Sequence, residues 1–292
     1  MTIAARLADF LSVGVIQTSL DHEAAWIGKP RMEVIEEEHA ITEIRRFTSA
    51  LRQDGSSPDI VLLPELSVPR GFIPRLRSMS RAMEAIVIAG VDYREIIDEK
   101  GQKAVCNEAV IFVPNQWRKR RISSRTTMRV LGKTYPAPGE LKNLTSIGYG
   151  FQKDTSIWLF DGDDVGTFAV AICYDFLDLE RVAAYRGKIQ HLFVLAYNKD
   201  INSFNHAAEA LARMIFCNVI VCNCGYFGGS HAVSPYRDPP LRTVYQHSGA
   251  KLAAAQVVML PVQSLYAHQR EAPLSGVPLF KSLPPGFSES LS

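Results

Sequence analysis

The stretch that decides the fold is "VGTFAVAICYDF", residues 165–176. Residues 167–173 are almost all apolar and include the β-branched Val170 and Ile172, a pattern typical of a buried strand. The run ends in Cys173, which is followed at once by Tyr174 and Asp175. A buried strand therefore carries a thiol to its C-terminal end and places it beside a carboxylate.

Similar apolar runs recur along the chain and alternate with amphipathic segments. Further strands are predicted at residues 11–17, 59–65, 85–93, 107–114, 155–160, 191–198, 219–225 and 253–262. Helices are predicted at residues 31–53, within 71–84, at 179–187 and at 203–218, with Ser203 as the N-cap of the last. Residues 155–160 should pair with 166–173, and "RTVYQHS" (242–248) should form a last pair with 253–262.

Alternating strands and helices, together with these hairpin-like pairs, indicate an α/β domain. We expect a four-layer helix-sheet-sheet-helix (αββα) sandwich. Residues 115–155 are basic and rich in glycine and proline, and we interpret them as a long loop region with room for a short helix. One domain should cover residues 1–270, followed by an irregular tail at 271–292, which holds four prolines and five serines.

Composition excludes several classes of protein. The 292 residues are 47% hydrophobic and 21% charged, which is ordinary for a globular chain, and the net charge of +2 does not favour nucleic-acid binding. No apolar run approaches the roughly 18 residues of a membrane span, and the N-terminus does not resemble a signal peptide. Five irregularly spaced cysteines fit a reducing compartment, so we expect a cytoplasmic protein.

Three reactive side chains follow apolar strands or lie in the loop region. Glu65 ends "IVLLPE", Cys173 ends "FAVAIC", and Lys133 lies in "GKTYPAPGE". Ligands gather at the carboxyl ends of strands in open α/β folds, so an acid, an amine and a thiol could meet there in one pocket.

These stretches resemble the nitrilase (carbon–nitrogen hydrolase) superfamily, in its amidase-like branch. The family has a Glu-Lys-Cys triad in this chain order, and the matching motifs are "LLPELS", "KTYPAPGE" and "CYD". The likeness continues in "NEAVIFVP", "EALARMIFCNVIVCNCG" and "GGSHAVSP" and covers roughly residues 12–262. It implies the αββα fold of the nitrilase type, no cofactor and no metal, and a homodimer or higher homo-oligomer.

The resemblance also implies roles for individual residues. Glu65 would be the general base for Cys173, which would attack the substrate as a thiolate and form a thioester. Lys133 and the backbone N–H of Tyr174 would stabilise the oxyanion. Glu140 would hold Lys133 in place. Tyr197 and Asn198, at the end of a strand, would line the substrate pocket.

Two points stay open at this stage. Leu131-Gly132 precedes Lys133 where the family often has an aromatic residue and arginine, whereas Lys119 follows Trp117-Arg118 in "WRKRRI". We prefer Lys133, because Pro136 and Glu140 follow it at the spacing of the family. The basic run around Lys119 is interpreted as a solvated loop near the site, and not as a nucleic-acid interface.

The expected activity is hydrolysis of a non-peptide C–N bond in a small linear amide or N-carbamoyl substrate, with release of ammonia or an amine. The alternatives are a nitrilase acting on a nitrile and a non-catalytic binding module on the same fold. A papain-like hydrolase would need a histidine base, and none of the seven histidines lies in a supporting motif. We expect a small-molecule amide as the binding partner, and no interaction with a membrane.

Overall fold

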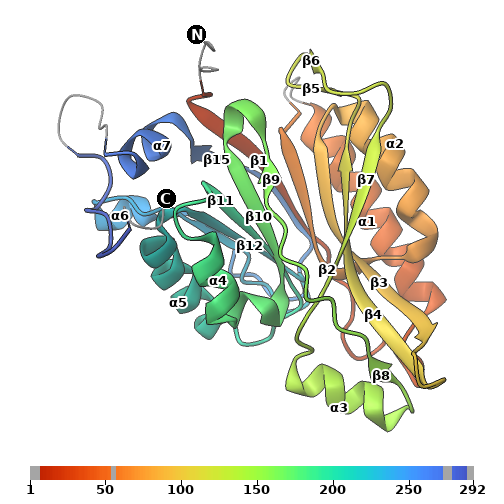
Figure 1. Ribbon diagram of the computed structural model, residues 1–292. Coiled ribbons are helices and arrows are strands. Elements are labelled where there is room, and N and C mark those ends of the chain that lie inside the picture. The colour runs from red at the N-terminus through yellow and green to blue at the C-terminus, as the bar shows by residue number, and fades with distance from the viewer. Residues whose placement is uncertain (1–6, 54–56, 272–277, 288–292) are drawn as a thin grey trace.

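A computed structural model describes residues 7–53, 57–271 and 278–287. Within these ranges the chain forms two large β-sheets that pack face to face (Figure 1). The first sheet has the strand order β15 (Ala254–Pro261), β1 (Phe10–Gln17), β2 (Ile60–Val68), β3 (Ile86–Ile97), β4 (Lys103–Val113) and β7 (Thr127–Gly132), with β8 (Gly150–Phe151) pairing with β4. The second has the order β14 (Thr243–Gln246), β13 (His231–Val233), β12 (Asn218–Asn223), β11 (His191–Ala196), β10 (Thr167–Ile172) and β9 (Phe160–Asp161).

Helices cover the outer face of each sheet (Figure 1). On the first sheet, α1 (Val34–Gln53) and α2 (Ile73–Met83) bury Ile44, Phe47 and Leu76 against strand residues such as Val61 and Val87. On the second sheet, α4 (Leu179–Tyr185) and α5 (Ile201–Leu211) cover the outward-facing residues of β10, β11 and β12. The expected four-layer α/β sandwich is confirmed.

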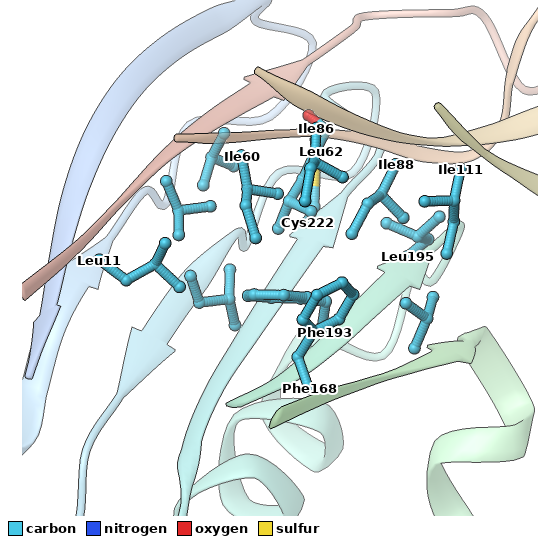
Figure 2. Close-up of a cluster of buried hydrophobic side chains, with 14 of the residues drawn as sticks. Leu11, Ile60, Leu62, Ile86, Ile88, Ile111, Phe168, Phe193, Leu195 and Cys222 are labelled. Atoms are coloured by element: carbon cyan, nitrogen blue, oxygen red, sulfur yellow. Dashed lines mark hydrogen bonds between the residues drawn. The ribbon is translucent and has the colours of Figure 1, made fainter. Parts of the chain in front are cut away.

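The largest core cluster lies between the two sheets, where apolar side chains interdigitate (Figure 2). The first sheet contributes Leu11, Ile60, Leu62, Ile86, Ile88 and Ile111, and the second contributes Phe168, Phe193, Leu195 and Cys222. Alternate residues of β2 and β10 face this cluster and the helices, so both strands are buried on both faces. Continuous apolar runs are the pattern that such strands require.

The region 115–155 is more ordered than the sequence suggests. It contains the hairpin of β5 (Gln116–Trp117) and β6 (Arg120–Arg121), the strand β7 and the helix α3 (Pro138–Ser146). The expectation of a long loop is therefore wrong for β7, which pairs with β4 over six positions, from Glu108↔Gly132 to Val113↔Thr127. The β5–β6 hairpin lies between β4 and β7 along the chain, so the sequence of residues 127–132 alone does not reveal this pairing.

Residues 155–160 do not form the predicted strand. Only Phe160 and Asp161 pair with β10, as β9. The segment before them is held by Asp154, whose side chain accepts hydrogen bonds from the backbone N–H groups of Gly132 and Ser156, both at 2.9 Å. These side-chain bonds take the place of a longer strand ladder.

Two further predictions are corrected. The residues expected to form a last pair lie in different sheets: β14 pairs with β13, whereas β15 pairs with β1 over eight positions and buries Val258 and Leu260 in the central core. The helix α5 begins at Ile201 instead of Ser203. Its N-cap is Asp200, whose carboxylate accepts from the backbone N–H and hydroxyl of Ser203 at 3.3 and 2.7 Å.

The described part of the tail packs on the domain. Phe280 and Phe287 are buried beside Phe216 and Leu265, and Phe280 bridges to Tyr236. The rest of the tail, residues 272–277 and 288–292, lies outside the described residues, as do residues 1–6 of the N-terminus. The remaining helices are α6 (Pro239–Arg242) and α7 (Gln263–Gln269). None of the helices in the described ranges is long and apolar enough to cross a membrane.

Candidate active site

Glu65 is presented by a bulge in β2. The parallel pairing of β2 with β3 shifts register between Leu63 and Val68, and Leu66 has φ 55°. Gly90 of β3 makes the bulge possible, because a Cβ on that residue would lie 2.3 Å from the Pro64 carbonyl oxygen and 2.4 Å from the Glu65 Cα. The bulge turns Glu65 into a position where the side chain is only 2% exposed.

Lys133 follows directly after β7 and reaches the same place. Its backbone N–H donates to the Asn107 carbonyl at 2.8 Å, which continues the β4–β7 ladder by one residue. Its Nζ donates to Glu65 Oε1 at 2.7 Å and to Glu140 Oε2 at 2.5 Å. The side chain is 1% exposed, so the ammonium is held by two carboxylates away from water.

Glu140 belongs to the first turn of α3, which Pro138 begins. Its Oε2 also accepts from the Ala137 backbone N–H at 3.1 Å, so the side chain caps its own helix. Its Oε1 accepts from Tyr93 Oη at 3.0 Å and from Asn107 Nδ2 at 2.8 Å. The carboxylate is therefore fully occupied by donors that hold it against Lys133.

Cys173 lies where β10 turns into a short 3₁₀ segment, Cys173–Leu177. Its φ is 47°, in the left-handed region that a residue with a side chain rarely adopts. Cys173 is 5% exposed, and its thiol lies next to the Glu65 carboxylate and the Tyr197 backbone N–H. The Tyr197 N–H also donates to Glu65 Oε2 at 3.0 Å, so it connects base and thiol.

Burial and neighbouring charges set the protonation of these groups. Burial and the Glu65 charge raise the pKa of Cys173 well above its ordinary value, against the attraction of Lys133, so the resting thiol keeps its proton. Burial acts to lower the pKa of Lys133, but the charges of Glu65 and Glu140 outweigh it and hold that pKa above its ordinary value. Burial raises the pKa of Glu65 although Lys133 opposes it, which makes this carboxylate a stronger base than an exposed one.

Asp175 joins the cysteine turn to the lysine loop. Its carboxylate accepts from the backbone N–H groups of Thr134 at 2.9 Å and Tyr135 at 2.8 Å, and it is 1% exposed. Because Asp175 follows β10 of the second sheet and Thr134 follows β7 of the first, these bonds tie the two halves of the site together.

The sequence matches no protein-family model and no curated protein. The structure is similar to Nit3 of Saccharomyces cerevisiae, a member of branch 10 of the nitrilase superfamily, with a TM-score of 0.61 and 15% identity over 92% of this chain and 97% of that one. It is also similar to XC1258 of Xanthomonas campestris, a CN-hydrolase superfamily protein with an arsenic adduct in its active site (TM-score 0.62, 12% identity, 90% and 95% covered).

A third similar structure is a mutant amidase from Nesterenkonia sp. AN1, whose active-site cysteine carries the acetamide moiety of fluoroacetamide. Its TM-score is 0.58 with 15% identity, over 90% of this chain and 94% of that one.

The chain has the nitrilase-superfamily fold.

Within this nitrilase fold, the structure brings together four residues that the sequence singled out: Glu65, Lys133, Glu140 and Cys173. It places Lys133, and not Lys119, beside Glu65. Lys119 is exposed in the turn of the β5–β6 hairpin. The spacing of Pro136 and Glu140 after Lys133 thus agrees with the position of this lysine beside Glu65, and its catalytic role stays a prediction.

The structure places the other three predicted site residues, Tyr174, Tyr197 and Asn198, differently with respect to this group. Tyr197 contributes its backbone N–H, and its hydroxyl is 3.1 Å from His22 Nδ1. Tyr174 follows Cys173 and its side chain is 38% exposed. The Asn198 side chain does not join the group, because its Nδ2 donates to the Asp200 carbonyl at 2.8 Å and closes a turn.

Asn107 and Tyr93 were not recognised from the sequence. Asn107 donates from one Nδ2 to Glu65 Oε1 and Glu140 Oε1, both at 2.8 Å. The available signal was its place at the start of "NEAVIFVP", a stretch that already resembled the family. In the described part of the chain, no group of three or more His, Cys, Asp or Glu side chains is arranged to hold a metal ion.

Proposed function

We propose that this chain is a thiol-dependent hydrolase of non-peptide C–N bonds, with small linear amides or N-carbamoyl compounds as substrates. The observation that carries the proposal is the Lys133 ammonium, held between Glu65 and Glu140 in a buried site next to the Cys173 thiol. A base, a fixed cation and a nucleophile in one water-poor place are the components that acyl transfer requires.

In the first half of the reaction, Glu65 takes the proton of Cys173 and the sulfur attacks the carbonyl carbon. Lys133 and the Tyr174 backbone N–H stabilise the oxyanion of the tetrahedral intermediate. Glu65 returns the proton to the nitrogen as the C–N bond breaks, so ammonia or an amine leaves and a thioester remains. Glu140 keeps Lys133 charged and in place.

In the second half, Glu65 removes a proton from a water molecule, and the hydroxide attacks the thioester. The C–S bond breaks, the acid leaves, and the proton held by Glu65 restores the Cys173 thiol. One carboxylate thus serves as base and acid in each half.

The test is ammonia release from a panel of propionamide, N-carbamoyl-β-alanine and propionitrile. We expect activity on an amide or carbamoyl compound, its loss in Cys173→Ala, and a decrease of at least about 10²-fold in Lys133→Ala. Two variants serve as controls and should retain activity: Lys119→Ala, because Lys119 is exposed, and Cys106→Ala, because Cys106 contacts Arg94 instead of the site. Cleavage of the nitrile alone would contradict the amide proposal, and unchanged activity in Cys173→Ala would contradict the thiol mechanism.

A further inference from the structure

Residues 18–33, which we call the strap, connect β1 to α1 and pass beside the candidate site. Side chains hold much of the strap. The Ser19 N–H donates to Glu43 at 2.7 Å and the Asp21 N–H to Glu36 at 2.9 Å. The Met32 N–H donates to Asp92 Oδ2 at 2.8 Å. The strap is thus held at its start by α1 and at its end by the first sheet.

Trp26, in the middle of the strap, packs on two residues that contact the site carboxylates. Its ring meets Tyr197 edge-on at a centroid distance of 5.4 Å and Tyr93 at 6.2 Å. Tyr197 donates its N–H to Glu65, and Tyr93 donates its hydroxyl to Glu140. Trp26 is therefore one side chain away from both carboxylates.

Asp92 fixes the orientation of the Trp26 ring. Its Oδ1 accepts from Trp26 Nε1 at 2.8 Å and from the Tyr93 backbone N–H at 2.9 Å. The carboxylate is 2% exposed, and with the bond from Met32 it receives three N–H donors. A buried carboxylate with this many donors keeps a single rotamer, so the ring that it binds is positioned precisely enough to shape a pocket.

The site is closed in this arrangement. Glu65, Lys133 and Cys173 are 5% exposed or less, whereas Trp26 and Tyr197 are only partly buried. A molecule that approaches the thiol from this side therefore meets these aromatic rings.

We propose that Trp26 is a specificity-determining residue, which forms with Tyr93 and Tyr197 an aromatic wall that admits only short groups to Cys173. If the chain is the hydrolase proposed above, on which this reading of the substrate rests, the wall limits the length of the acyl group. Asp92 is the positioning residue of the wall.

The experiment measures alkylation of Cys173, which does not require hydrolytic activity. Cys173 is labelled with iodoacetamide and with the bulkier N-phenyl-iodoacetamide, and both rates are followed by peptide mapping in the full chain. The thiolate displaces iodide in both cases, so the ratio of the two rates reports the space around the sulfur. We expect Trp26→Ala to raise the ratio of bulky to small reagent about tenfold, the usual scale for a change in an apolar pocket.

Three further variants make the result specific. Asp92→Asn replaces one of the two acceptor oxygens with an NH2 donor, so it can no longer accept all three N–H groups as Asp92 does, and it should raise the ratio in the same direction, by less. Trp26→Phe keeps a ring but loses the Nε1 donor to Asp92, so its ratio should lie between wild type and Trp26→Ala, and it provides a folded variant if Trp26→Ala does not fold. Trp158→Ala is the matched control, because Trp158 is 41% exposed and stacks on Phe160 outside the wall; its ratio should not change.

An unchanged ratio in Trp26→Ala and Asp92→Asn, with wild-type urea unfolding curves, would overturn the proposal. A changed ratio in a chain that hydrolyses no amide supports the wall and refutes only the proposed function. In an active chain, Trp26→Ala should also improve kcat/KM for phenylacetamide relative to propionamide, whereas an equal change for both would show that Trp26 does not select acyl length.

Discussion

The candidate site places two carboxylates and one ammonium close together in a nearly dry environment. When all three groups are ionised, Lys133 neutralises one of the two carboxylate charges, so Glu65, Glu140 and Lys133 together carry a net charge of −1. Asn107 compensates for part of this net charge, because its single Nδ2 donates to both carboxylates. The Asn107 amide donates to the two carboxylates, whereas an aspartate of the same shape would repel them, and this difference can be tested by substitution.

Replacing Asn107 should damage the site in two graded steps. Asn107→Ala removes a donor from both carboxylates, whereas Asn107→Asp adds a third negative charge. Each change raises the pKa of Glu65 further, Asp more than Ala, so the acid limb of the pH dependence of kcat/KM should move to higher pH in that order. At pH 7 we expect a loss of roughly 10- to 100-fold for Asn107→Asp, corresponding to about 1.5–3 kcal/mol for hydrogen bonds to charged groups.

Asn143→Asp is the matched control for charge, because Asn143 is exposed on α3, the helix that carries Glu140. Its acid limb should stay at the wild-type pH. An acid limb that does not move in Asn107→Asp would show that Asn107 does not interact with the base.

At the scale of the elements, the close packing of β3 against β2 permits the bulge in β2. The bulge that presents Glu65 approaches β3 so closely at Gly90 that no larger residue fits there. The contact is with backbone atoms of Pro64 and Glu65, which cannot rotate away as a side chain could. The packing of two strands thus determines the position of the candidate base.

Gly90→Ala should therefore displace Glu65 and destabilise the fold. We expect a decrease of about 1–3 kcal/mol in the free energy of unfolding, as for other overpacked sites, together with a large decrease in ammonia release. Urea unfolding and the activity assay measure the two effects. Gly71→Ala is the control, because a Cβ on Gly71 meets no atom within 4 Å; equal effects of both substitutions would contradict the role of the close approach.

At the scale of the whole molecule, a second buried polar group lies at the far end of β11 from the site. His191 begins β11, whereas Tyr197 follows its end. His191 is 0% exposed, with Nε2 2.9 Å from the Val165 carbonyl and Nδ1 3.1 Å from Asn218 Nδ2. Burial lowers the pKa of His191 to about 4, so the ring is neutral in the folded protein.

This histidine predicts a loss of stability in acid. Between the ordinary pKa of about 6.5 and the folded pKa of about 4, the unfolded chain binds a proton that the folded chain does not. The stabilisation is complete above pH 6.5 and is lost as the pH falls towards 4, by about 3 kcal/mol in total. Urea unfolding at pH 7 and pH 4 should show this loss in wild type and a smaller loss in His191→Gln.

His206→Gln, on the exposed side of α5, should keep the wild-type loss. If His191→Gln loses as much stability in acid as wild type, then protonation of His191 does not contribute to acid unfolding.

The sequence predicted the fold best where a pattern is local. Apolar runs identified β1, β2, β3, β4, β10, β11 and β12, and the motif spacing singled out Glu65, Lys133, Glu140 and Cys173. The prediction from sequence failed where the pairing of a strand depends on a partner strand far along the chain. The strand β7 is largely exposed, with Leu131 as its buried residue, but it is ordered by pairing with β4. The strand β15 pairs with β1 and not with β14, its neighbour along the chain.

By itself, the sequence determined which segments are strands buried on both faces, which helices cover them, and which reactive side chains stand at strand ends. These properties depend on composition and period over a few residues. Only the tertiary structure decided that Glu65 and Lys133, from the first sheet, meet Cys173 and Tyr197, from the second. Glu65 and Cys173 are joined by packing of the two sheets over the central core, and that packing energy depends on contacts that no local pattern contains.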